Sequence, residues 1–520
     1  MEIPQKIIIP SLAKNTLYNF LFRGTGLFFG FVTSIVVARI LGPEKLGEYS
    51  LAFWILTMVG FLVNLGLPTT VTKYVSEYTG KNDYKSAGLI LRNCSRWILW
   101  AGVILTILLF IFAPLLADLY HKPYLSIYLR IGSLGVIPMG LLAIYMAGFS
   151  GFLRYDLIAL LTFILSPLTF LLILLVMLFK GKVESLFWVS FISNLVGFFL
   201  YFNFYHSKKC PFSKEGFSLE LKNKLIDYSK SIFIILLLEA FLWERFELLF
   251  LGAFSTERQV AFYNLGFNLA NKVILLLPGA FAGVLLPTMS EAYGSAQEER
   301  LISIHYNSTR YLALLVFPLC AGGIFLSPRI ITSIYGAEYL PSALIFSIIL
   351  LAGAFGALSQ ASSSMLYSLE KQKVILRFYI LSVFLKLILN LIFTRKFQTL
   401  GAVWVSFSTQ AFFGLGIIIY VYAIFLKEKF PLIPILKIIL ASVLMGILVY
   451  FLSSFLLGVY GLGICILLGI IFYPIFLTFI RGLEKLDFDL ASRHIVKLPF
   501  GLDKVFSKFL EIIKRFSPGN

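Results

Sequence analysis

The chain has 520 residues, of which 59% are hydrophobic and only 13% are charged. Soluble domains contain about 45–50% apolar and about 25% charged residues, so this composition excludes a water-soluble globular protein and predicts one solvated largely by lipid. The net charge of +18 lies in short connectors between apolar runs rather than in a basic domain, which argues against nucleic acid as a partner.

Apolar runs follow one another from the N-terminus onward. The N-terminal segment, Met1 to Leu17, is short and polar and lacks a signal-peptide pattern. It leads into an apolar run that we expect to act as an uncleaved insertion signal. A membrane-spanning helix needs about 20 mainly apolar residues. This criterion predicts an all-α polytopic membrane protein with about fourteen transmembrane helices. The predicted spans lie near Leu17–Leu41, Gly47–Leu67, Ile98–Leu119, Ile127–Phe149, Leu157–Phe179, Leu186–Tyr205, Ser231–Phe254, Val260–Leu286, Tyr311–Leu326, Ser342–Tyr367, Val374–Phe393, Leu400–Phe425, Ile433–Phe455 and Val459–Ile480.

Lysine and arginine are unevenly distributed among the connectors. With both termini in the cytoplasm, the inner connectors and tails, together with Arg377 and Lys437 at the inner ends of their spans, carry 30 of the 44 basic residues, and the outer connectors carry 8. This asymmetry fits the positive-inside rule, whereas the opposite orientation violates it. We therefore predict a multi-pass protein of the cell (plasma) membrane with cytoplasmic termini. All outer connectors are short, so no outer domain is expected.

One motif occurs twice along the chain. The first copy has LGEYSLAF (Leu46–Phe53), then a span, then LPTTVTKYVSEYTG from Leu67; the second has VAFYNLGF (Val260–Phe267), then a span, then LPTMSEAYG from Leu286. Six predicted spans separate the copies, so both have the same orientation. A parallel repeat of this kind predicts a site between two halves, about an axis along the membrane normal.

The same segments carry a family resemblance. Ala38–Phe53 and Val260–Gly294 are similar to the paired signatures of the multidrug/oligosaccharidyl-lipid/polysaccharide exporter superfamily, and Ser362–Ser406 resembles spans ten to twelve of that family. The resemblance is specific to the polysaccharide-transporter, or O-antigen-flippase-like, branch. It implies a protein that flips polyprenyl-diphosphate-linked oligosaccharides by alternating access between two six-helix lobes. The two extra C-terminal spans match that branch and the lipid II flippases, and could form a groove for the polyprenyl tail.

These observations predict five parts. They are an N-terminal six-helix lobe (1–205), a cytoplasmic linker (206–230), a C-terminal six-helix lobe (231–425), two additional transmembrane helices (426–480) and a cytoplasmic tail (481–520). In the tail, apolar residues recur at helical spacing between lysines. This pattern is typical of an amphipathic helix, either on the inner leaflet or packed on the cytoplasmic face of the bundle.

Charges inside predicted spans are candidate functional groups, because a charge at mid-bilayer costs several kcal/mol. Arg23, Arg245, Lys272 and Lys386 qualify, and we predict that they attract a diphosphate or an acidic sugar. The family commonly has asparagine at the position of Lys386, so this residue departs from the pattern. Further polar residues predicted to line the cavity are Ser34, Asn64, Asn268 and Asn390.

Two spans have an unusual polar pattern. In the first, Arg23, Gly26, Gly30 and Ser34 share one face, which suits either a water-filled cavity or close helix packing. In the seventh, Glu239, Glu244 and Glu247 occupy one arc, whereas Arg245 lies about 160° from Glu247 on a regular helix. Either Arg245 therefore pairs with another helix, or the span is kinked.

The resemblance bears on the three glutamates. Glu247 matches an acidic position of the family, and related transporters use a carboxylate of the seventh span for cation coupling. The alternatives are a structural ion-pair network among Glu244, Arg245 and Lys272, and contact with the substrate. The expected coupling ion is a proton or sodium, with no other cofactor. The cysteines and histidines are scattered, so no metal site is expected.

Three functions remain open at this point. The first is transport of a lipid-linked oligosaccharide by a monomer, with membrane lipids and polysaccharide-assembly enzymes as further partners. The second is antiport of drugs or small cations by a related member of the superfamily. The third is a membrane-embedded sugar polymerase or ligase, which needs positioned acids, bases or a metal facing a large polar loop. Because the outer connectors are short, we do not expect an enzyme.

Overall fold

The computed structural model describes residues 12–207, 219–276, 278–295, 297–426, 430–456, 458–484 and 487. The regular elements in this part of the chain are all helices, which confirms the predicted fold class. The chain divides into two compact units, Met1–Asn264 and Leu265–Asn520. The first therefore includes the predicted inter-lobe linker as well as the seventh span, and the predicted part boundaries remain a prediction.

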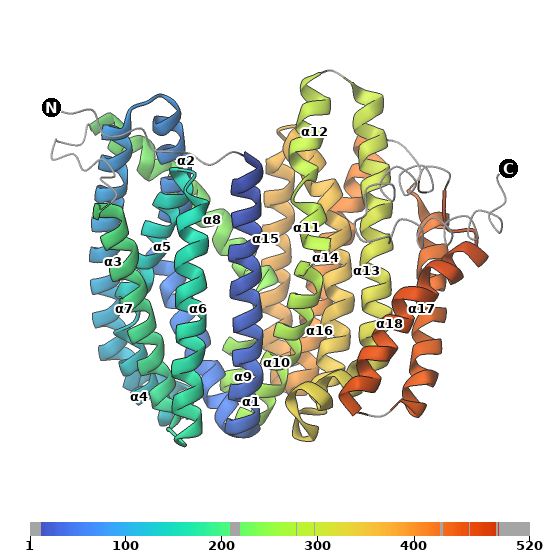
Figure 1. The fold of residues 1–520 in the computed structure, drawn as a ribbon, viewed down its shortest axis with the longest axis horizontal. Helices are drawn as coiled ribbons and strands as arrows, with labels where there is room; N and C mark the ends of the chain where they lie inside the picture. Colours follow the sequence, from blue (N-terminus) through green and yellow to red (C-terminus); the bar gives the residue numbers. More distant parts are fainter. Residues whose placement is uncertain are drawn as a thin grey trace. The chain divides into compact units, whose positions relative to one another are not determined.

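The first unit is built from helices that run largely side by side (Figure 1). They are α1 (Leu12–Asn64), α2 (Leu67–Gly80), α3 (Tyr84–Leu119), α4 (Tyr124–Ser133), α5 (Val136–Gly151), α6 (Tyr155–Leu178), α7 (Val183–Ser207), α8 (Leu219–Trp243), α9 (Leu248–Phe254) and the first part of α10 (Glu257–Leu276). Inside this unit α1 packs against α6, and α5 packs against α2, α3 and α7.

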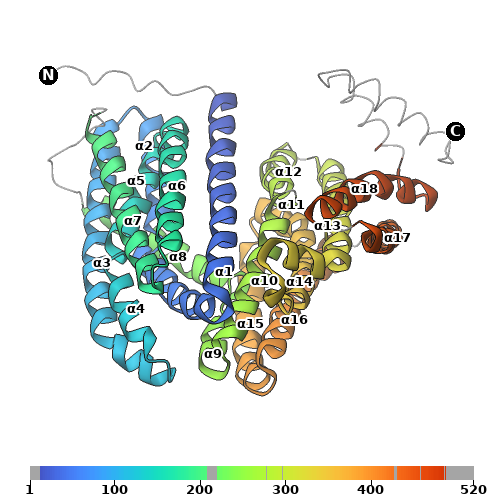
Figure 2. The same cartoon turned by 60° about the horizontal axis from the view of Figure 1, so that its bottom comes forward.

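The second unit begins within α10. It contains α11 (Pro278–Ala282), α12 (Leu285–Gly294), α13 (Glu298–Tyr335), η1 (Ala337–Tyr339), α14 (Ser342–Ser368), α15 (Gln372–Leu389), η2 (Asn390–Thr394), α16 (Arg395–Tyr420), η3 (Val421–Leu426), α17 (Leu432–Phe455) and α18 (Gly458–Phe479). The central contacts join α13 to α14 and α14 to α16. The added pair, α17 and α18, packs on α13 (Figure 2).

Nine helices of the described residues are long and apolar enough to cross a membrane, or ten if the bent pair α4 and α5 forms one span. Two of these runs, Leu17–Gly80 and Gln372–Ile424, each contain two predicted spans. The predicted seventh and eighth spans correspond to the interrupted helices α8–α9 and α10–α11. A count by helix length and composition takes merged helices as one span and leaves out interrupted ones, so the number of fourteen spans remains a prediction.

The break between the first two predicted spans lies inside α1 at Gly42. This residue has φ 71° and ψ 172°, and Pro43 follows it. Positive φ strains residues that carry a Cβ but not glycine, and proline disfavours a helical conformation at the residue before it. The chain therefore turns at Gly42 between the two halves of α1, where the sequence predicts a connector.

Close to this turn, α4 and the connector before it hold the start of α10 and the second half of α1 by hydrogen bonds. Lys122 donates a hydrogen bond to Glu257 at 2.5 Å, and the hydroxyl of Tyr128 donates to Glu48 at 2.8 Å. Burial opposes ionisation of Glu257, but the hydrogen bonds from Lys122, Tyr124 and the backbone, together with the charge of Lys122, outweigh it and lower the pKa of this carboxyl. The ion pair therefore stabilises the fold at neutral pH, and its contribution is lost as the pH falls through that lowered pKa.

Replacing Gly47 with alanine is expected to destabilise the first unit. A Cβ at Gly47 would lie 1.9 Å from the backbone carbonyl oxygen of Glu257, so the two helices would have to separate. We expect the free energy of unfolding to fall by about 3 kcal/mol or more, measured as a lower melting temperature in detergent. Gly24→Ala is the matched control, because a Cβ there meets nothing within 4 Å and alanine favours a helix. Equal melting temperatures for the two variants would contradict this prediction.

Candidate functional site

The predicted seventh span is broken at its charged residues. Helix α8 ends at Trp243 and α9 begins at Leu248, so residues 244–247 are not helical. A regular helix would have pointed Arg245 and Glu247 in nearly opposite directions. The break removes this constraint, and the predicted kink is present.

Arg245 also contacts another helix, so both predicted alternatives occur together. Its Nη1 donates a hydrogen bond to the amide oxygen of Asn264 at 2.6 Å, and Asn264 donates from its amide nitrogen to the hydroxyl of Ser50 at 2.9 Å. This polar chain, Arg245–Asn264–Ser50, joins the break to α10 and to the second half of α1. Neither Asn264 nor Ser50 was predicted as a site residue, although a signal was available: the two occupy equivalent positions in the two copies of the repeated motif.

The three glutamates of this span have different environments. Glu247 is completely buried, whereas Glu239, on α8, is half-buried and Glu244, in the break, is exposed. A fully buried carboxylate inside an apolar bundle is costly and is a candidate functional group. Glu247 is therefore the strongest of the three for cation coupling, which remains a prediction.

In the second unit, Lys386 and Asn390 lie where α15 passes into η2. Lys386 is 1% exposed and Asn390 is fully buried. The amide of Asn390 donates to the backbone carbonyl of Lys386 at 2.9 Å and accepts from the hydroxyl of Thr394 at 2.8 Å. The element η2 is a π-helical turn, a feature that is frequent at functional sites. Lys272 and Asn268, both half-buried, lie on α10 in the same unit.

The predicted polar face of the first span is only partly reproduced. Arg23 is exposed and donates to Asn19 on its own helix, and the hydroxyl of Ser34 donates to the carbonyl of Phe31. Asn64 ends α1 and is half-buried. Arg23 and Arg245 belong to the first unit, whereas Lys272 and Lys386 belong to the second. A common site for all four cations remains a prediction.

A cavity of about 460 Å³ lies inside the first unit, between α1 and the helices α4 to α7. Gly26 and Gly30 are among its lining residues, as is Thr33, whereas Ser34 is not. A Cβ at either glycine would meet nothing within 4 Å. Close packing requires a neighbouring atom at a small residue, so within this unit Gly26 and Gly30 border a cavity rather than a helix contact. Arg23 and Ser34, the other members of the predicted stripe, are not among its lining residues.

Three comparisons with known proteins agree with this architecture. Residues 36–344 match the model of a family described as "polysaccharide biosynthesis protein". The chain is 24% identical over 510 residues to the probable low-salt glycan biosynthesis flippase Agl15 of Haloferax volcanii, covering 94% of this chain and 99% of that protein. It is 23% identical to the teichuronic acid biosynthesis protein TuaB of Bacillus subtilis, covering 68% and 73%. Its fold is similar to that of the lipid II flippase MurJ in an inward closed conformation, with a TM-score of 0.70, 18% identity, and coverage of 89% and 98%.

Proposed function

Because the chain belongs to the family of polysaccharide biosynthesis proteins, we propose that it flips a polyprenyl-(di)phosphate-linked oligosaccharide from the cytoplasmic to the outer leaflet by alternating access. The family match confirms the resemblance seen in Ala38–Phe53 and Val260–Gly294. The observation that carries the proposal is the match to a glycan biosynthesis flippase over 99% of its length. The relatives bear the names of transporters and biosynthesis proteins, in agreement with the prediction that this chain is not an enzyme.

The described residues support a transporter through their placement of polar groups. Glu247, Lys386 and Asn390 are buried among apolar helices, and Glu247 lies with the half-buried Arg245 at a break in a span. Charged groups and unwound segments within the membrane mark substrate and ion pathways in transporters. In the proposed mechanism, Arg23, Arg245, Lys272 and Lys386 attract the diphosphate during passage. Glu247 takes up the coupling proton or sodium ion, with Glu239 and Glu244 as its neighbours on the span.

Neutralising the cations one at a time tests this proposal. The purified protein is reconstituted into vesicles with a fluorescent polyprenyl-diphosphate-linked disaccharide, and the flipping rate is measured from the accessibility of the lipid to an added quencher. We expect Arg245→Gln and Lys386→Gln to slow flipping, because each removes a charge that attracts phosphate in the proposed mechanism. Arg258→Gln, in a predicted outer connector, is the control. Unchanged rates in Arg23, Arg245, Lys272 and Lys386 variants would remove these cations from the mechanism, and an inactive wild type would contradict the proposed function.

A further inference from the structure

We propose that the cavity of the first unit is a binding subsite for an uncharged sugar residue of the lipid-linked glycan. The proposal rests on the proposed function and extends it by assigning the sugar part of the substrate to this cavity. With a volume of about 460 Å³, the cavity falls within the range of roughly 300–1,000 Å³ that is usual for small-molecule sites. Its wall is formed by side chains of a single compact unit.

The cavity lining carries no charge. None of the described residues that line it is aspartate, glutamate, lysine, arginine or histidine. Moving a carboxylate or phosphate into such a site removes its water without supplying a counter-ion, which is strongly unfavourable. The diphosphate and any acidic sugar are therefore expected to stay outside this cavity, whereas a neutral sugar can enter.

Hydroxyl and amide groups are spread over three helices around the cavity. Thr33 lies on α1, Ser166 and Thr169 lie on α6, and Ser193 and Asn194 lie on α7. Hydroxyl and amide side chains both donate and accept hydrogen bonds, as the ring hydroxyls of a sugar do. The hydroxyl oxygen of Ser193 is buried with no hydrogen-bond partner among the described residues. This oxygen has almost no accessible surface, so the hydrogen bonds expected to a sugar come from the other polar groups of the lining.

An aromatic surface completes the wall. Tyr49 and Phe53 line the cavity and are stacked on each other, with ring centroids 5.4 Å apart and an interplanar angle of 29°. Phe187 lies against Tyr49 at 5.4 Å. Aromatic side chains offer a large rigid apolar face, and Tyr adds a polar group at its tip. The aromatic side chains can therefore cover the C–H face of a sugar ring while polar groups of the lining contact its hydroxyls.

The glycines of α1 provide the test. Gly24 and Gly30 lie on the same helix, both are exposed, and a Cβ at either meets nothing within 4 Å. Only Gly30 lines the cavity. Gly30→Leu therefore fills the cavity, whereas Gly24→Leu adds the same side chain outside it. The probes are polyprenyl-diphosphate-linked chitobiose, which has neutral sugars, and polyprenyl diphosphate without sugar. Binding to the purified protein is measured by native mass spectrometry, and flipping is measured in vesicles.

We expect Gly30→Leu to weaken binding of the chitobiose lipid at least tenfold and to leave binding of polyprenyl diphosphate unchanged. Gly24→Leu should match the wild type with both probes. Equal binding of chitobiose lipid by the two leucine variants overturns the subsite. A second contradicting result uses a glucuronic-acid-linked lipid: the subsite is also overturned if the wild type binds this lipid as tightly as chitobiose lipid and Gly30→Leu weakens both equally. A wild type that binds chitobiose lipid in a Gly30-dependent manner but does not flip it retains the subsite and overturns the proposed function.

Discussion

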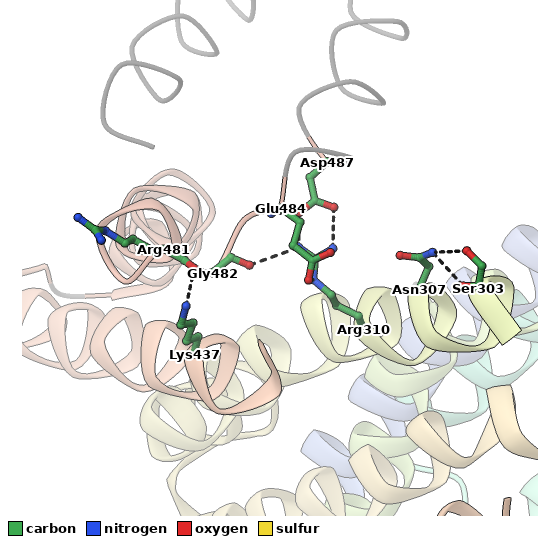
Figure 3. A network of polar contacts seen from close by, with 8 residues as sticks. All are labelled: Ser303, Asn307, Arg310, Lys437, Arg481, Gly482, Glu484 and Asp487. Atoms are coloured by element: carbon green, nitrogen blue, oxygen red, sulfur yellow. Dashed lines mark hydrogen bonds and ion pairs between the residues drawn. The ribbon is translucent and has the colours of Figure 1, made fainter. Parts of the chain in front are cut away.

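Replacing Arg310 with alanine is expected to produce the largest loss of stability among single substitutions in the second unit. Arg310, on α13, is fully buried and contacts the segment that follows α18 (Figure 3). Its guanidinium donates to both carboxylate oxygens of Asp487 and to the carbonyl of Gly482, and its Nε lies 3.3 Å from a carboxylate oxygen of Glu484. Asp487 in turn accepts from the backbone amide of Glu484 at 2.8 Å.

Removal of one partner from a buried ion pair leaves the other charge uncompensated. The cost is about 3–5 kcal/mol where the remaining charge is buried. The side chain of Asp487 is 12% exposed and that of Glu484 is 39% exposed, so Asp487 accounts for most of the expected loss and Glu484 for little of it. In Arg310→Ala, the carboxylates of Glu484 and Asp487 lose their counter-ion, and the segment after α18 loses its attachment to α13. The melting temperature of the detergent-purified protein should therefore fall markedly. Limited proteolysis should also cut near residue 484 sooner than in the wild type.

Two further variants identify the cause. Arg300→Ala is the matched control on the same helix, because Arg300 is exposed and forms a surface ion pair with Glu291 at 3.5 Å; such pairs contribute about 1 kcal/mol or less. The triple variant Arg310→Met, Glu484→Gln, Asp487→Asn removes all the charges together. It should recover much of the lost stability if uncompensated burial is the cause. A melting temperature for Arg310→Ala equal to that of Arg300→Ala would contradict the assigned role of this contact.

Arg310 also shows where prediction from sequence ends. The apolar runs predict the helices well, because lipid demands long apolar segments whatever they pack against. Arg310 lies at the end of a predicted inner connector, and its partner Asp487 follows 177 residues later. No periodicity connects the two positions, so only the tertiary structure reveals the contact.

In the candidate site, too, local features could be predicted from the sequence, whereas contacts between distant segments could not. The conflicting directions of Arg245 and Glu247 on a regular helix predict a kink, since helix geometry is local. From the sequence, Gly26 and Gly30 could border either a cavity or a closely packed helix, because small residues suit both. Only the positions of the neighbouring helices distinguish the two. The repeated motif aligns Ser50 with Asn264, but their hydrogen bond depends on how the two copies meet.

Breaking the polar chain Arg245–Asn264–Ser50 is expected to have the largest effect on transport. Arg245 is held by the amide oxygen of Asn264 at 2.6 Å, and the amide is itself oriented by Ser50. A hydrogen bond to a charged group contributes about 1.5–3 kcal/mol. If it positions Arg245 for the substrate, Asn264→Ala should slow flipping about 10- to 100-fold. Ser50→Ala leaves the acceptor of Arg245 in place, so its effect should be several-fold smaller.

A swap of the two equivalent residues separates positioning of Arg245 from simple attachment of α10 to α1. The double variant Ser50→Asn, Asn264→Ser keeps an amide–hydroxyl pair between the helices but moves the amide away from Arg245. If the polar chain Arg245–Asn264–Ser50 positions Arg245, the swapped variant should have a melting temperature near that of the wild type. It should flip the substrate as slowly as Asn264→Ala does. Asn264→Asp, which retains an oxygen acceptor facing the guanidinium, should recover much of the flipping rate. Normal flipping by the swapped variant would show that the pair only attaches α10 to α1 and that Arg245 needs no partner on α10.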